Sequence, residues 1–427
     1  MRVNLPLILI LLYLSSCREH AVVDPAYIDS FIASYKPSQP VQVNAGDLAF
    51  WKARIDKGPE SFVNEEKLAA ALTTRFHYFN DIDDLKQADS LYSKINVQFK
   101  ETDPGILLHL ASVSMLQHRF REATAYLEKV RKLQAEPYAV NMMLFDADLE
   151  LGQYEVADSL LKRNRLLKDY AYQFRQSRID HYKGTLDSSI SHMLQAADAA
   201  GSNEGLRQAA LSNAADLYVH KGALKEAAAL YRQCLTYNAS DFHSLTGLGW
   251  LALVHDHQTT LAETIFSFVG RHSNNPDPVF KQIQAAEVSD PNKAVVLARQ
   301  FLSRVEQPEY GDMYNKYLID LYTGVLRQPE KALAIARKEV TNRATPQTYA
   351  WLVWSLYQNR QMAEAQQLFT EQVSGRPLEA LELYYIGMMM KGSRKDYNAT
   401  QFLEAALENE YDLSPSKVKT IRKALEE

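Results

Sequence analysis

Two short runs of the sequence carry side chains of the kinds that bind metal ions. The first is His255, Asp256 and His257, where two imidazoles and a carboxylate suit zinc. Two histidines two residues apart cannot share one helix face, and zinc usually needs three or four ligands, which no further residue nearby supplies. We therefore expect structural histidines and no metal. A metal-dependent hydrolase using His255 and His257 is the weakest functional alternative.

The second run holds three clustered carboxylates, Asp81, Asp83 and Asp84. A calcium loop of the common twelve-residue type requires a glycine at its sixth position and a glutamate at its twelfth, and this run has neither. Aspartates of this kind are frequent at solvated turns. The pattern favours a turn between helices over a calcium site.

Motifs for other chemistry are absent. The sequence has no P-loop, G-x-S-x-G, HExxH, CxxC or GxGxxG pattern. The run Met388 to Met390 indicates adaptable packing more than a thioether metal site. A net charge of −5 argues against a nucleic-acid partner, which would need a strongly basic face. We predict no enzymatic activity and no cofactor.

Cys17 stands directly after an apolar run from Leu5 to Leu14. Ten helical residues extend about 15 Å, half of a hydrocarbon core of about 30 Å, so the run is too short to span a membrane. Its length is that of the apolar part of an export signal. No other segment approaches eighteen consecutive apolar residues.

The residues Leu14-Ser15-Ser16-Cys17 resemble the bacterial lipoprotein box. This resemblance implies that residues 1–16 are a signal peptide, that the chain is cut before Cys17, and that the thiol is diacylglycerated. The alternative is an ordinary cleaved signal with a chance cysteine. Arg18 and Glu19 follow Cys17, in place of the aspartate that retains some lipoproteins in the inner membrane. We therefore expect a lipid-anchored protein of the cell envelope at the outer membrane, on either side.

Residues 17–46 read as a tether. Asp24-Pro25 predicts the start of a short helix with an apolar stripe that packs on the main body. The stretch from Gln39 to Gly46 lacks a helical pattern. A flexible tether of this length would reach on the order of 30 Å.

A small residue recurs along the rest of the chain at intervals between 32 and 38 residues. The ten positions are Ala88, Ala123, Ala157, Ser189, Ala227, Ala262, Ala294, Ala332, Ala365 and Ala399. Around Ala227, apolar residues at Leu211, Tyr218 and Tyr231 fall at fixed distances before and after it. The mean interval is about 34.6, close to the 34 residues of a tetratricopeptide repeat (TPR).

This pattern resembles the TPR family, whose unit is a pair of antiparallel helices that approach closely at small residues. The resemblance implies an all-α, TPR-like solenoid, a right-handed superhelix of about ten helix pairs over residues 47–410, with a capping helix over 411–427. Gly152, Gly184 and Gly222 fall at the turns within the pairs. Cys234 takes a small-residue position, which predicts a buried, inert thiol.

The concave face of a TPR array is its usual binding surface. The template places nine candidate residues there: His77, Asp146, Arg178, His181, Asp216, Trp250, Tyr317, Trp354 and Tyr384. The Lys and Asn pair of the family's carboxylate clamp occurs in no unit, so that specificity is not carried over. Aromatic residues and arginine are common interface anchors, although each of these could instead pack against neighbouring helices.

These features predict a membrane-anchored scaffold that binds an unknown protein or peptide, such as a membrane protein, in the periplasm or at the cell surface. Lipidated TPR proteins that this chain resembles serve in outer-membrane protein, pilus or secretin assembly. The alternative is a surface lipoprotein that binds carbohydrate on a TPR scaffold. Such proteins add long insertions, for which the regular intervals leave little room.

Overall fold

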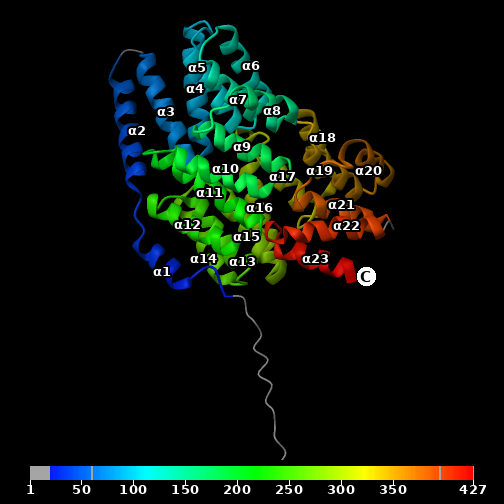
Figure 1. Cartoon of the computed structure of the whole chain (residues 1–427). Coiled ribbons are helices and arrows are strands. Elements are labelled where there is room, and N and C mark those ends of the chain that lie inside the picture. Colours follow the sequence, from blue (N-terminus) through cyan, green and yellow to red (C-terminus); the bar gives the residue numbers. More distant parts are fainter. Residues whose placement is uncertain (1–19, 59–60, 394–395, 427) are drawn as a thin grey trace, which may run out of the picture.

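The computed structural model describes residues 20–58, 61–393 and 396–426 (Figure 1). In these ranges every regular element is a helix, which confirms the all-α prediction. Helices α3 to α22 form ten consecutive pairs within the described residues, each with a first helix A and a second helix B.

The A helices carry the odd numbers. They are α3 (Phe62–Phe79), α5 (Pro104–Leu116), α7 (Pro137–Glu150), α9 (Tyr170–Tyr182), α11 (Glu204–His220), α13 (Phe242–Val254), α15 (Asp277–Ser289), α17 (Asn315–Thr323), α19 (Pro346–Gln358) and α21 (Ala380–Gly392). A short 3-10 segment, η1 (Pro308–Tyr310), precedes α17.

The B helices carry the even numbers. They are α4 (Ile82–Gln98), α6 (Phe120–Lys132), α8 (Tyr154–Arg163), α10 (Leu186–Ala199), α12 (Leu224–Tyr237), α14 (Thr259–His272), α16 (Pro291–Val305), α18 (Pro329–Asn342), α20 (Met362–Leu368) and α22 (Asp396–Glu408). A π-helical segment, η2 (Phe369–Val373), continues α20.

The ten small residues found in the sequence lie one on each B helix, and each is at most 1% exposed. A residue without a long side chain lets the two helix axes of a pair approach closely, and larger side chains fill the space around the contact. The recurrence is therefore a packing requirement repeated once per pair. The chain folds as an all-α solenoid of the TPR type, as predicted.

The turns within the pairs use left-handed backbone. Gly152, Gly184 and Gly222 have φ angles of 78°, 74° and 76°, and each lies between the two helices of its pair as predicted. A side chain at these φ angles would be strained, and glycine avoids this. Pro291 begins α16 directly after the capping residue Asp290.

The N-terminal part of the described chain is held on the solenoid. Helix α1 (Pro25–Ser34) packs against α14 and buries Ile28 completely, as expected for the short helix. Helix α2 (Gln39–Lys57) packs on α3, so the prediction that Gln39 to Gly46 is not helical is wrong. Pro40 lies in the first turn of α2, where no backbone N–H donor is needed. Residues 20–46 are therefore not a flexible tether.

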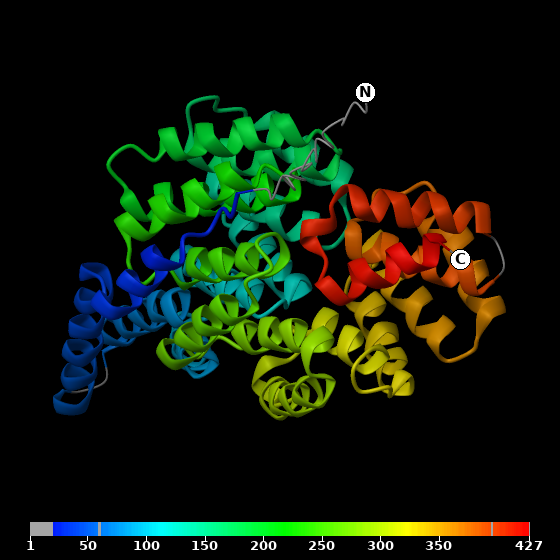
Figure 2. The ribbon, with the colours of Figure 1, turned by 90° about the horizontal axis from the view of Figure 1, so that it is seen from below.

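Units far apart in the sequence touch one another, because the superhelix brings its later part against its earlier part. The Arg121 side chain on α6 donates to the carbonyl oxygens of Thr341 and Asn342 on α18. Asn274, after α14, donates its backbone N–H to the carbonyl oxygen of Phe79 at 2.9 Å. Figure 2 shows the red C-terminal helices beside the green middle units. The concave face is consequently closed in part by the chain itself.

The C-terminal segment packs where the later units of the solenoid meet the earlier ones. It consists of a 3-10 turn, η3 (Glu410–Asp412), and helix α23 (Pro415–Glu426). Helix α23 packs on α22, as a cap would, and also on α15 and α21, while η3 packs on α11. The segment therefore joins the end of the array to its middle.

Candidate functional site: an inner cavity

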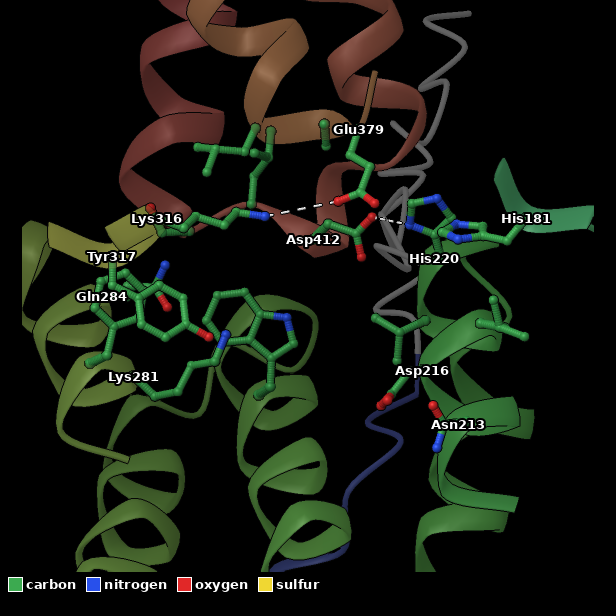
Figure 3. Close-up of a pocket in the computed structure, with 18 of the residues that line it drawn as sticks. His181, Asn213, Asp216, His220, Lys281, Gln284, Lys316, Tyr317, Glu379 and Asp412 are labelled. Atoms are coloured by element: carbon green, nitrogen blue, oxygen red, sulfur yellow. Dashed lines mark hydrogen bonds and ion pairs between the residues drawn. The ribbon is translucent and has the colours of Figure 1, made fainter. Parts of the chain in front are cut away.

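A cavity of about 500 Å³ lies inside the curve of the solenoid (Figure 3). One wall comes from α9 and α11, and the opposite wall comes from α13, α15 and α17. The start of α21 and the segment from η3 to α23 close it on a third side. The closure of the superhelix thus turns part of the concave face into a pocket with charged and aromatic walls.

Five of the nine residues predicted on the concave face line this cavity. They are Arg178, His181, Asp216, Trp250 and Tyr317. The other four lie elsewhere. His77 is exposed on α3, and Asp146 is half-buried on α7 in an ion pair with Arg178.

The remaining two aromatic residues serve packing. Trp354 is 6% exposed, stacks on Tyr385 with 4.8 Å between ring centroids, and donates its indole N–H to Thr323 at 2.9 Å. Tyr384 is half-buried beside the same stack. Both were candidates for partner contact, and the structure gives them contacts within the protein.

An ion-pair chain fixes one end of the cavity. Arg178 donates to Asp146 at 3.0 Å and to Glu150 at 2.8 Å, and Glu150 also pairs with Arg343 at 3.1 Å. Arg343 follows α18, so this chain of pairs links the third and fourth units to the end of the eighth. The guanidinium of Arg178 is therefore largely occupied by the protein's own carboxylates.

Two histidines line the neighbouring stretch of wall. His220 pairs with Asp412 from η3, and its ring meets that of His181 edge-on with 4.8 Å between centroids. Burial alone would lower the pKa of His220, but the Asp412 carboxylate outweighs it and raises the pKa. Burial, with the charge of His220, lowers the pKa of His181. On this side of the cavity, Asp412 thus favours the charged form of His220, while burial favours the neutral form of His181.

Asp216 on α11 is also engaged. It accepts hydrogen bonds from the Tyr231 hydroxyl at 2.5 Å and from His243 at 2.9 Å. The charge of Asp216 raises the pKa of His243 to about 9. The carboxylate therefore has a cationic partner of its own at neutral pH.

The opposite wall carries two ammonium groups and an aromatic cluster. The Lys281 Nζ lies 3.5 Å from the centroid of the Trp250 ring, and Tyr317 stacks on Phe280 at 4.3 Å. Figure 3 shows Lys281 and Lys316 on this wall, across the cavity from His181, Asn213 and Asp216. The Trp250 indole N–H is bound to the Tyr411 carbonyl oxygen at 2.7 Å, which leaves the ring face for the lysine.

Lys417 on α23 forms a buried ion pair at the cavity wall. Its ammonium contacts Asp320 at 2.9 Å, and both side chains are at most 10% exposed. Asp320 and Glu287 together outweigh the effect of burial and raise the pKa of Lys417. Ser416 donates to Glu287 from the same helix. This network attaches the C-terminal segment to the cavity wall.

A second cavity of about 570 Å³ adjoins the first, with residues of α7, α8 and α19 in its lining. The two cavities share five residues, namely Arg178, His181, His220, Lys316 and Glu379. The inner face of the solenoid is therefore hollow over a longer stretch than one pocket.

Several side chains of the two metal-like runs make contacts within the protein, and Asp84 is buried on α4 instead of lying at a solvated turn. Asp256 accepts hydrogen bonds from the backbone N–H groups of Val22 and Val23, each at 2.9 Å, and from His255 at 2.6 Å. Asp81 caps α4, and Asp84 pairs with Arg75. No group of three or more His, Cys, Asp or Glu side chains within the described ranges is arranged to hold a metal ion.

Cys234 is buried as predicted, and burial raises the pKa of its thiol to about 12. Cys17, the predicted lipidation site, lies outside the described residues. Over the part of the chain that the structure covers, none of the helices combines the length and apolar character needed to cross a bilayer.

Sequence reasoning missed several residues of the cavity: His220, Lys281, Gln284, Lys316, Glu379, Asp412 and Lys417. The last three come from the start of α21, η3 and α23, which no repeat template places on the concave face. A signal existed for Lys281. The connection between α15 and α16 is Asp290 alone, whereas that between α7 and α8 has three residues. In this unit the concave positions of the A helix therefore lie two residues closer to the small residue of the B helix than the template assumes.

No protein-family model and no curated protein matches the chain. Among solved structures, it aligns with a TPR protein from Parabacteroides merdae at 13% identity, covering 60% of this chain and 97% of that one, with a TM-score of 0.35. It aligns with PilF from Pseudomonas aeruginosa at 11% identity, covering 50% and 97%, with a TM-score of 0.36.

A third alignment is to a signal-transduction ATPase with a TPR sensor from Pyrococcus horikoshii. The identity is 13%, the TM-score is 0.43, and the alignment covers 88% of this chain and 54% of the ATPase. At such scores the three alignments carry no argument about function.

Proposed function

We propose that this protein is a lipid-anchored scaffold that binds another protein through the inner face of its solenoid. The single observation that carries the binding role is the hollow inner face itself, where side chains from units far apart in the sequence converge on two adjoining cavities. A solenoid of stacked pairs presents such a face without further loops, and a preformed site lowers the entropy cost of binding.

Site-specific photocrosslinking tests the binding role. A photoreactive phenylalanine replaces Tyr317 in the cavity, and a matched variant carries it at Val296, which is 55% exposed on the B helix α16. In the native host, the variant at 317 is expected to yield a discrete crosslinked product that the variant at 296 lacks. Equal products from both positions would show that the inner face is not the binding surface.

The anchoring role rests on the lipoprotein-like box that ends at Cys17. Two or three acyl chains on one cysteine would meet or exceed the two-signal requirement for stable membrane attachment. Because Val22 and Val23 are held by Asp256, only four residues separate Cys17 from the held segment. Five residue steps reach at most about 18 Å, so the proposed anchor keeps the turn after α13 close to the bilayer.

Mass spectrometry of the N-terminal peptide tests the anchor. The mature chain is expected to begin at Cys17 with a diacylglyceryl group, and a Cys17→Ser variant should leave the membrane fraction. Cys234→Ser is the matched control, because this buried thiol has no role in anchoring and its loss should leave the protein in the membrane fraction. An unmodified N-terminal cysteine would refute the anchor without affecting the crosslinking result.

The carbohydrate-binding alternative has no separate observation in its favour, because the connections between the described helices are short. The inner face, by contrast, has both the aromatic rings and the charged groups that protein partners commonly contact.

A further inference from the structure

Lys281 is a cation that forms no ion pair within the described residues. Its ammonium rests on the Trp250 ring and forms no hydrogen bond or ion pair with any described residue. Burial lowers the pKa of Lys281 to about 8, which means that the nearby carboxylates do not replace the lost water. A buried charge is normally paired, so an unpaired ammonium on a cavity wall leaves a place for an anion.

Lys316 lies on the same wall and is only loosely paired. Its Nζ is 3.9 Å from a Glu379 oxygen and 3.8 Å from a Glu382 oxygen, which is longer than a hydrogen bond. Its side chain is 36% exposed and lines both cavities. The ammonium thus keeps hydrogen-bond donors that can turn toward a ligand.

Gln284 lies one helical turn after Lys281 on α15 and also lines the cavity. The residue is 7% exposed, and its Oε1 atom has no hydrogen-bond partner. A buried acceptor in this state costs free energy until a donor reaches it. A ligand with an O–H or N–H group beside its anionic group would satisfy both residues of this helix face.

Other charged side chains of the cavity lining form ion pairs within the protein. His220 pairs with Asp412, and Lys417 pairs with Asp320. Asp277, one helical turn earlier on α15, attracts the Lys281 ammonium but forms no ion pair with it. Among the lysines of the lining, Lys281 is therefore the one that has no carboxylate within ion-pair distance in the described part of the chain.

We propose that the inner cavity is a carboxylate-binding site, in which Lys281 and Lys316 hold the carboxylate and Gln284 accepts a hydrogen bond from a neighbouring O–H or N–H group of the ligand. The rings of Trp250 and Tyr317 border this position and receive the apolar part of the ligand. The carboxylate belongs either to an acidic side chain of a bound protein segment or to a small organic acid. The proposal shares its cavity with the proposed function and does not require the lipid anchor.

Two probes separate these sources. The first is a random heptapeptide display library selected on the purified protein, and the second is 3-phenylpropanoate, titrated beside its uncharged amide, 3-phenylpropanamide. A peptide source predicts selected sequences enriched in Asp and Glu whose Gln counterparts bind at least tenfold more weakly. A small-acid source predicts binding of 3-phenylpropanoate with at least tenfold preference over the amide.

Substitutions tie either result to the cavity. Lys281→Gln is expected to weaken carboxylate binding about ten- to a hundredfold, the usual effect of removing a charged hydrogen-bond donor. Lys281→Arg should retain most of the binding. Lys225→Gln, at an exposed lysine on α12, removes the same charge elsewhere and should change nothing.

An NMR measurement on Lys281 in the unsubstituted protein tests the proposal even if a variant folds poorly. Reductive methylation with ¹³C labels the lysine amines, and the Lys281 signal should shift on addition of the carboxylate ligand, with a rise in its pKa. The proposal is overturned if neither source yields a ligand, if the uncharged counterparts bind equally well, or if the Lys281 signal does not respond. None of these results would affect the outcome of the crosslinking test, so failure of this proposal can be distinguished from failure of the proposed function.

Discussion

The contact between Asp256 and the N-terminal segment gives the sharpest prediction. The carboxylate accepts the N–H groups of Val22 and Val23, each at 2.9 Å, and its side chain is completely buried. Asp256→Ala leaves both donors without an acceptor. A hydrogen bond to a charged group contributes about 1.5–3 kcal/mol, so the two bonds together hold the segment by about 3 kcal/mol or more.

Hydrogen exchange measures this directly. About 3 kcal/mol corresponds to roughly a hundredfold change in an opening equilibrium, so the amides of Val22 and Val23 should exchange about a hundred times faster in Asp256→Ala. The melting temperature should change little, because α1 keeps its own contacts through the buried Ile28. Asp187→Ala, at a side chain 84% exposed, is the matched control. Unchanged exchange at these two amides would refute the assigned role of Asp256.

Three further predictions follow from packing and charge. Ala227→Trp should destabilise the protein by about 1–3 kcal/mol or more in chemical denaturation, because Ala227 is completely buried between helices. Gly247→Ala should destabilise it by a similar amount, about 1–3 kcal/mol, since the added methyl group would lie 2.4 Å from the Tyr231 ring. In NMR, His243 should titrate near pH 9 instead of 6.5, and Asp216→Asn should return it toward 6.5. Because this pKa is raised, the pair stabilises the fold fully below pH 6.5 and loses its effect as the pH rises toward 9.

The repeat could be predicted from sequence because its cause is local and strict. A residue such as Ala123 or Ala365 is completely buried at the closest contact of its pair, and a larger side chain there would be excluded by close packing. The same demand returns once per unit, so the period is visible even though other positions vary. The buried thiol of Cys234 was predictable for the same reason.

Concave residues were harder to predict, because their positions depend on connection lengths. In the TPR template, one concave position lies fifteen residues before the small residue of the B helix. Counted back from Ala294, this position falls on Val279. The connection between α15 and α16 is two residues shorter than that between α7 and α8, and the correction moves this position to Lys281. A fixed template therefore passes over the cation that lines the cavity.

Helix α2 shows another limit. Pro40 reads as a break in the sequence, yet it lies in the first helical turn, where the missing N–H group is harmless. The helix is kept in place by tertiary contacts with α3, such as the bond from Asn44 to the Ala71 carbonyl oxygen at 2.9 Å. Because few of its residues are buried, its sequence has only a weak apolar period.

Closure of the superhelix could not be predicted from the repeat at all, because it depends on contacts between units nearly two hundred residues apart. The pair of Glu150 with Arg343 and the pair of His220 with Asp412 are of this kind. A periodic pattern specifies how neighbours stack, while the summed curvature of many units decides which distant units meet. The cavity exists only where they meet, so the curvature of the array, more than any motif, determines which concave residues remain available to a ligand. Tyr317 lines the cavity, whereas Trp354, two helices later, is packed between its neighbouring units against Thr323 and Tyr385.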